Sequence, residues 1–171
     1  MVISYRFKIV DFDVLIRGFQ DIPTFLQCCE DCPSFGATWT CPPFPADEME
    51  WTARVNRVLL VQAVAKDEAD ATIDELFCKA RERVNLLLRQ MELICGGRMM
   101  SAGGGCTQCE KCSRKEGNAC RFPEIRRPAL EAYGFNVCAI TEHFFGTEIK
   151  WSRKRKSISE ATLVGAVAYK R

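Results

Sequence analysis

Cysteine is the feature that most constrains what this chain can fold into, because 11 of its 171 residues are cysteines. An odd number of thiols cannot all be paired. The first 14 residues alternate polar and apolar side chains and lack the uninterrupted apolar stretch of a secretory signal. We therefore expect a cytoplasmic protein in a reducing compartment, where disulfides are rare and thiols more often bind metal. A disulfide framework is the minor alternative.

The composition is that of a soluble globular protein, with 47% hydrophobic and 27% charged residues. A chain of this length buries roughly 70% of the surface that its unfolded form exposes, so it does not need a metal merely to have a core. No segment approaches the roughly 20 apolar residues of a membrane-spanning helix, and we expect no membrane partner. The net charge of +2 indicates no particular partner.

Hydrophobic periodicity predicts four strands. Residues 3–9 alternate apolar and polar side chains, which is the two-residue period of a strand with one buried face. Residues 57–65 are aliphatic and β-branched, which favours a buried strand. Residues 97–105 are typical of a short strand that runs into a flexible loop. Residues 162–170 are typical of a last strand.

One long helix is predicted between the second and third strands. Its apolar residues follow steps of four and three, and Asp67 or Asp70 would cap it and Gly96-Gly97 would end it. This stripe also fits a three-heptad coiled coil, but packing on a sheet is the simpler interpretation. The stripe consists of Ile73, Phe77, Ala80, Val84, Leu87, Met91 and Ile94.

Shorter helices complete the predicted fold. Residues 123–133 and 136–145 indicate two short helices separated at Gly134, and Pro23 should end whatever helical turn precedes it. The predicted class is α+β: one mainly antiparallel sheet with helices packed on it, interrupted by two cysteine-rich metal-binding loops. We expect residues 1–171 to form a single metal-binding domain.

The stronger of the two cysteine motifs follows a glycine-rich stretch. Three thiolates at three-residue intervals can fold around one point, as in the loops that hold an iron-sulfur cubane. A single zinc ion usually takes two thiolates from each of two separate knuckles. The predicted cofactor is therefore a [4Fe-4S] cluster, with zinc as the alternative. A longer gap than in bacterial ferredoxins lets the fourth cysteine return to the same cluster. The candidate ligands are Cys106, Cys109, Cys112 and Cys120.

The second motif lies nearer the N-terminus. Cys29 and Cys32 form a CxxC knuckle to which Cys41 can return across a loop containing Gly36, a geometry suited equally to iron-sulfur or zinc. The adjacent Cys28 is either a fourth ligand or a spare buried thiol. If it is spare, the site has three thiolates and an open position, where a metal can act as a Lewis acid on a reactant.

The remaining candidate residues have simpler interpretations. Cys78, Cys95 and Cys138 stand alone in apolar surroundings, where cysteine commonly packs as a small hydrophobe. His143 is the only histidine, so the sequence does not favour a catalytic cysteine-histidine pair or histidine-rich zinc chemistry. The basic run 151–156 favours a solvated turn over nucleic-acid contact, and we expect no nucleic-acid partner.

Three arginines closely follow Cys120, the last cysteine of the glycine-preceded motif: Arg121, Arg126 and Arg127. Guanidinium groups near a reduced cluster would stabilise its negative charge and raise its reduction potential. Alternatively, these side chains form surface salt bridges worth only about 0–1 kcal/mol.

Together the two motifs resemble a family of predicted metal-binding proteins designated domain of unknown function 2284. The resemblance extends from about Cys29 to Val137, and more loosely to the C-terminus. All seven cysteines of the two motifs match, whereas Cys28 falls outside the pattern. Phe35 and Ala129 stand where the family has tyrosine and serine, which removes two hydroxyls and leaves the thiolates untouched. The resemblance implies metal binding of the iron-sulfur type and no established reaction. The other matching residues are Trp39, Pro42, Pro43, Arg121, Pro123, Arg127, Pro128, Glu131 and Gly134.

Three functions stay open on the sequence alone. The first is an electron-transfer protein with one or two [4Fe-4S] clusters, which would need a redox partner protein. The second is a zinc-binding structural module in which both cysteine groups are closed four-cysteine sites. The third is an enzyme with an open metal site at Cys29, Cys32 and Cys41. The sequence indicates no substrate and no oligomeric state.

Overall fold

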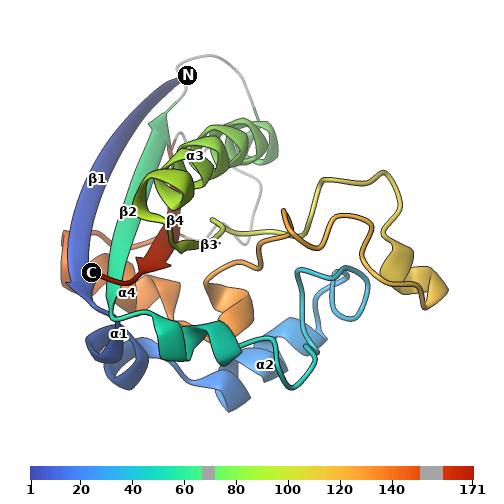
Figure 1. The fold of residues 1–171 in the computed structure, drawn as a ribbon. Coiled ribbons are helices and arrows are strands. Elements are labelled where there is room, and N and C mark those ends of the chain that lie inside the picture. The colour runs from blue at the N-terminus through green and yellow to red at the C-terminus, as the bar shows by residue number, and fades with distance from the viewer. Residues whose placement is uncertain (67–71, 151–159) are drawn as a thin grey trace.

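The computed structural model describes residues 1–66, 72–150 and 160–171. Its centre is a four-stranded antiparallel sheet in the order β1-β2-β4-β3 (Figure 1). The sheet and the helices on both of its faces confirm the predicted α+β class. The strands are β1 (Val2–Asp11), β2 (Arg57–Lys66), β3 (Arg98–Met100) and β4 (Glu160–Tyr169).

The two central strands are buried on both faces, which is why they are almost continuously aliphatic. The edge strand β1 differs from the prediction of one fully buried face. Ile3 and Tyr5 pack against the core, but Phe7 is 49% exposed and Ile9 is 61% exposed. Helix α3 (Ile73–Cys95) makes its sheet contacts with β2, β3 and β4, so the second half of the edge strand stays uncovered.

Helix α3 begins and ends with standard capping devices. Thr72 accepts a hydrogen bond from the Glu75 backbone N–H, while the Glu75 carboxylate accepts one from the Thr72 N–H. This capping box replaces the predicted caps, Asp67 and Asp70, which lie outside the described residues. Gly96 adopts φ +57° after the last turn and ends the helix as predicted.

The buried row of α3 is rotated from the predicted stripe. Ala80 and Val84 belong to both, and four other predicted residues are partly buried and pack against the core, whereas Ile94 is exposed. These four are Ile73, Phe77, Leu87 and Met91. The fully buried row advances in steps of four. Its members are Leu76, Ala80, Val84, Leu88 and Glu92.

Close packing between α3 and β4 depends on Gly165. A β-carbon at this position would lie 2.4 Å from Leu88 Cδ1, which is fully buried. The absence of a side chain therefore allows the helix to approach the strand.

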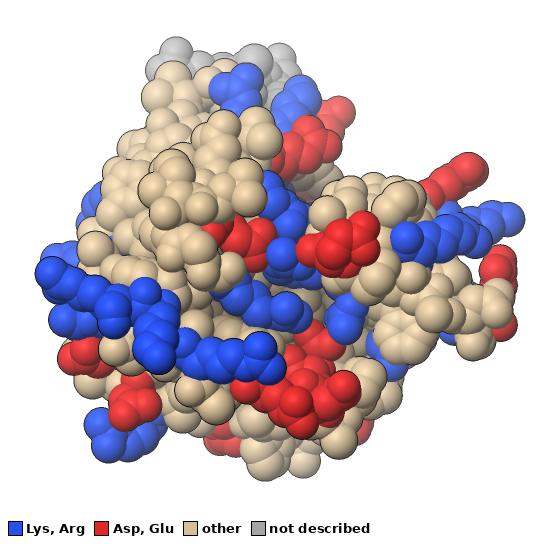
Figure 2. Space-filling view, viewed as in Figure 1, with Lys and Arg blue, Asp and Glu red and all other residues tan. Residues whose placement is uncertain are grey.

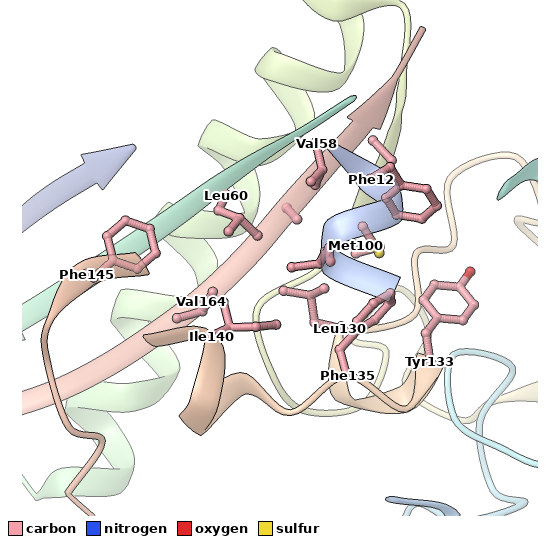
Figure 3. Close-up of a cluster of buried hydrophobic side chains, with 13 residues drawn as sticks. Phe12, Val58, Leu60, Met100, Leu130, Tyr133, Phe135, Ile140, Phe145 and Val164 are labelled. Atoms are coloured by element: carbon pink, nitrogen blue, oxygen red, sulfur yellow. The ribbon is translucent and has the colours of Figure 1, made fainter. Parts of the chain in front are cut away.

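The opposite face of the sheet is covered by α1 (Phe12–Phe19) and α4 (Val137–Phe145). Figure 3 shows their apolar side chains meeting those of the central strands. Asn136 caps α4 by accepting a hydrogen bond from Ala139 N–H at 3.0 Å, and the predicted helix over 136–145 is confirmed. The largest fully buried side chains in this cluster are Tyr133, Phe12, Phe135, Leu15, Leu60, Met100, Leu130 and Ile140.

One prediction in a proline-containing segment is wrong, whereas the helix before Pro23, α1, ends at Phe19 and so does not extend to that proline. Residues 123–133 contain only the short 3-10 turn η3 (Glu131–Tyr133), because Pro128 and its neighbours bond instead to the end of β3: Ser101 N–H donates to Pro128 O at 2.9 Å. Pro23 lies in the first turn of α2 (Ile22–Glu30), where its missing N–H removes no helical hydrogen bond.

In the described part of the chain, no helix is long and apolar enough to cross a membrane.

The two cysteine groups lie outside the sheet and its covering helices. The first follows from α2 into an irregular segment that ends before the 3-10 turn η1 (Glu50–Arg54). The second begins after β3 and includes the 3-10 turn η2 (Ser113–Glu116). Figure 1 shows the second segment, in yellow, extending away from the sheet, with the first segment in light blue between it and η1.

Candidate metal centre

The four cysteines of the second group line one small cavity of about 20 Å³. The chain closes this cavity with a tight turn in which Asn118 N–H donates to Ser113 O at 3.0 Å and Gly117 adopts φ +73°. The Ser113 hydroxyl is buried and donates to Ala119 O at 2.7 Å, which fixes the part of the loop that leads to Cys120. The structure therefore brings together Cys106, Cys109, Cys112 and Cys120.

The other three cysteines of this cavity also affect the thiol of Cys106. Burial raises the pKa of the Cys106 thiol above its ordinary value of 9.0, and negative charge on the other three cysteines raises it further. The Gln108 backbone N–H lowers this pKa by donating to the sulfur. The free thiol is thus protonated near neutral pH, and a metal that binds it must displace the proton.

The first group is carried by the C-terminal turn of α2 and the loop behind it. Cys32 N–H donates to Cys29 O at 2.9 Å, which forms the predicted CxxC knuckle. The loop then reverses at Gly36, whose N–H donates to Pro42 O at 2.8 Å and whose φ is +62°. This reversal returns Cys41 toward the knuckle.

Cys29 is the half-buried centre of the first group. Burial raises the pKa of its thiol above 9.0, and negative charge on Cys41, Cys32 and Cys28 raises it further. Cys28 and Cys32 are exposed. Cys28 is therefore not the buried spare thiol of one sequence interpretation.

Within each group the thiols are neighbours, but they do not converge on one point. Among the described residues, no three or more His, Cys, Asp and Glu side chains are spaced to hold a single metal ion. The four thiolates of one zinc ion all lie about 2.3 Å from the same centre. The thiolates of a [4Fe-4S] cluster bind separate iron atoms and stand farther apart. Binding of one ion would therefore require these thiols to move closer together.

Arg114 joins the two cysteine segments, and the sequence analysis missed it. From η2 it reaches the first segment and donates to Thr38 O at 2.7 Å and to Cys41 O at 2.6 Å, as well as to Pro43 O. Its guanidinium also lies 5.0 Å from the Trp39 ring centroid. No local sequence pattern predicts that Arg114 links the two segments, because all of its hydrogen-bond partners lie more than 70 positions away in the sequence.

Trp39 makes a second link between the segments. Its indole N–H donates to Asn118 O at 3.1 Å, and its side chain lines the four-cysteine cavity. The two candidate metal sites are thus neighbours that share a wall.

Glu131 is the other residue that the sequence analysis left without a role. Its Oε2 is buried and has no hydrogen-bond partner among the described residues. Burial raises the pKa of this carboxyl from 4.5 to about 7, and the backbone N–H of Glu131 and the Arg81 guanidinium oppose the rise. The negative charge of Glu131 also raises the pKa of Cys29, so the carboxylate lies beside the first cysteine group. Its match to the family pattern was the only signal in the sequence.

The three arginines after the second group lie in different surroundings. Arg121 and Arg126 line the four-cysteine cavity. Arg121 also makes a long surface contact of 3.8 Å with Glu116. Arg127 instead makes a 2.5 Å ion pair with the buried Glu92, which is not a surface salt bridge.

The isolated cysteines and the single histidine differ in how far the structure buries them. Cys78 is exposed, so its predicted place in the core is wrong; Cys95 and Cys138 are half-buried. His143 is exposed and meets Phe144 edge to face, with ring centroids 4.7 Å apart. The basic run 151–156 lies outside the described residues.

Comparison with known families supports metal binding. A family model described as predicted metal-binding protein, domain of unknown function 2284, matches residues 21–168. The chain belongs to this family. The match to domain of unknown function 2284 includes both cysteine groups and the sheet strands β2, β3 and most of β4. Neither a curated protein nor a solved structure matches the chain.

Proposed function

We propose that this metal-binding protein carries a [4Fe-4S] cluster on Cys106, Cys109, Cys112 and Cys120 and acts in electron transfer with a redox partner protein. The observation that supports the proposal most strongly is the single cavity lined by all four thiols. When bound, such a cluster supplies one-electron transfer at a potential set by burial and by hydrogen bonds to sulfur.

The residues around the cavity suit an anionic inorganic group. Trp39 and Phe122 border it with aromatic rings, which reduces the access of water. Arg121 and Arg126 supply positive charge, and the Gln108 N–H donates to the Cys106 sulfur. These contacts favour the reduced, more negative state of a cluster and would raise its potential.

The first group, Cys29, Cys32 and Cys41, is proposed to hold a second metal. Its CxxC knuckle, closed by the 2.9 Å hydrogen bond from Cys32 N–H to Cys29 O, is also the geometry of a zinc knuckle. Zinc is therefore the second candidate for this group, with a second iron-sulfur cluster as the first.

Anaerobic purification followed by iron, sulfide and zinc analysis tests the proposal. We expect brown protein with iron and sulfide, a visible absorption band, and bleaching by dithionite. Cys109→Ser should remove the share of the band, and of the iron and sulfide, that belongs to the four-cysteine cluster, whereas Cys78→Ser, at an exposed thiol outside both groups, should leave the band intact. Colourless protein with stoichiometric zinc in both groups would refute the cluster.

A further inference from the structure

A second and much larger cavity lies beside the four-cysteine site, with a volume of about 360 Å³. One wall is the exposed side of α3, and the other is formed by residues 105–108 and 125–127. The volume is in the range of small-molecule sites. Figure 2 shows Lys and Arg side chains, in blue, gathered in the hollow between the α3 part of the molecule and the cysteine-bearing segments, with acidic side chains, in red, at its rim.

Four arginines line this cavity from both sides. Arg81 and Arg89 lie two helical turns apart on the same face of α3, and Arg126 and Arg127 face them from the loop opposite. The only carboxylate in the described lining is Glu82. Arginine is the side chain best suited to bind oxyanions, because its planar fork matches carboxylate and phosphate oxygens.

The arginines are held in place before any ligand binds. Glu92 accepts from Arg127 Nε at 2.5 Å, from Arg89 Nη1 at 3.2 Å and from Met99 N–H at 2.7 Å. This carboxylate is buried at the end of the core row of α3, so it fixes both guanidinium groups. Positioned donors bind with less loss of side-chain entropy.

A matching arrangement holds Arg126. Its Nη1 donates to Trp39 O at 2.8 Å, and its Nη2 pairs with Glu48 at 2.5 Å. Glu48 is also buried and pairs with Arg98 at 3.2 Å. Arg98 does not line the cavity, but the four arginines that do line it outnumber the two buried carboxylates, which leaves an excess of positive charge on this wall. Glu82 at the wall and Glu131, within electrostatic range of Arg81, oppose that excess.

Several guanidinium donors remain for a ligand. Among the described residues, Arg81 uses only Nη2, which donates to Gly105 O, and Arg127 Nη2 has no partner. The Arg81 guanidinium lies against Gly104, where a β-carbon would be 2.5 Å from Arg81 Nη1 and φ is +69°. Glycine at this position therefore leaves the space that Arg81 occupies.

The rest of the lining mixes neutral polar and apolar groups. Thr40, Ser101, Thr107 and Gln108 provide hydroxyl and amide groups. Apolar contact comes from Leu86, Met99 and Ile125. Such a lining fits an organic molecule with an anionic group better than a bare inorganic ion.

We propose that this cavity is a binding site for a small organic oxyanion, a carboxylate or a phosphate ester, whose charged group is held by Arg81 and Arg127. The site goes beyond the proposed electron transfer, because none of its guanidinium donors depends on the metal held by the cysteines. Cys106 lines both cavities, so a bound molecule lies next to the four-cysteine site.

The test is calorimetric titration of the anaerobically purified full chain with inorganic phosphate and, separately, with succinate, at constant ionic strength. We expect saturable binding of at least one probe, and the tighter probe identifies the oxyanion class. Absence of saturable binding with both probes would overturn the proposal.

Matched variants on α3 locate the binding. Leu86 lines the cavity and is 62% exposed, whereas Leu93 is 77% exposed on the same helix and does not line it. Leu86→Glu should weaken binding by about tenfold, because it adds a negative charge at the wall without removing a packed side chain. Leu93→Glu should bind as the unchanged protein does. Equal affinities of these two variants would place the anion elsewhere and refute the site.

A second pair tests the arginine itself. Arg81→Gln should weaken binding by tenfold or more, whereas Arg83→Gln removes the same charge from an exposed position of α3 and should have little effect. Arg81→Lys should recover part of the affinity if charge alone matters, and little if the fork geometry is required. Unchanged binding by Arg81→Gln, with an unchanged thermal melt, would contradict the assigned role.

Discussion

Three glutamates with buried carboxyl groups differ in how well their negative charge is compensated. Glu131, Glu92 and Glu48 are all acidic residues inside the structure, but only the last two are paired with arginines by ion pairs. The unpartnered Oε2 of Glu131 is therefore the atom whose burial is least compensated.

The first prediction concerns this carboxyl. Its pKa is about 7 in the folded chain and 4.5 ordinarily, so between these values the folded state retains a proton that the unfolded state has released. Stability should therefore fall as the pH rises from about 4.5 to about 7, by roughly 3 kcal/mol in total. Glu131→Gln should remove this fall, and urea unfolding at pH 5, 6 and 8 measures it.

Glu142→Gln is the matched control for Glu131→Gln, because Glu142 is an exposed residue of α4. It should keep the pH profile of the unchanged protein. Parallel profiles for Glu131→Gln and the control would contradict the raised pKa.

The second prediction at this scale concerns Arg114. Its hydrogen bonds to Thr38 O and Cys41 O tie the two cysteine segments together, and a hydrogen bond to a charged donor contributes about 1.5–3 kcal/mol. Arg114→Leu should lower the free energy of unfolding by about 2 kcal/mol and accelerate metal loss to a chelator. Lys115→Leu, at the exposed neighbouring position, should do neither. Normal metal retention in Arg114→Leu would show that the segments are held by other contacts.

A helix or strand could be predicted from the sequence where it depends on residues close together in the chain, and not where it depends on distant ones. The strands and α3 were predictable because two- and four-residue periods are local, and Gly96 and Gly134 mark real breaks in the chain. The failed prediction over 123–133 has a distant cause, since those residues bond to Ser101. The same holds for Arg114, whose partners are far away in sequence. For the site, the sequence could group the cysteines, but not the charges around them.

The third prediction tests how closely α3 packs on β4. Gly165→Ala places a β-carbon 2.4 Å from Leu88 Cδ1 and 3.1 Å from Ala102 N and Met100 O, so helix or strand must shift. We expect a loss of about 1–3 kcal/mol in urea unfolding, as for other overpacked cores.

A double-mutant cycle separates this clash from other effects. Leu88→Ala alone should destabilise by about 2–5 kcal/mol, but by less in the Gly165→Ala background, where it removes the clash. Strictly additive losses would argue against direct contact between these two positions.

On the scale of the whole molecule, the metal sites and the core are separate. The two hydrophobic clusters on the faces of the sheet contain none of the seven candidate ligand cysteines. The sheet and α3 therefore have their own source of stability, in contrast to zinc fingers, which unfold without metal.

The fourth prediction follows from this separation. Removing metal with EDTA and ferricyanide should leave the far-UV circular dichroism nearly unchanged, because sheet and helices remain packed. Trypsin should then cut at Lys111 and Lys115 in the second cysteine segment, sites that the loaded protein protects. Loss of the cooperative thermal transition after metal removal would instead mean that the metal stabilises the entire fold.

The position of Cys106, on the wall between the large cavity and the four-cysteine cavity, has a thermodynamic consequence. Any electron added on one side of that wall repels an anion on the other side. Reciprocity then requires that occupancy of the large cavity shift the midpoint potential by the same free energy by which reduction weakens the anion's affinity. One sulfur atom would in this way make the molecule a sensor of its own ligand.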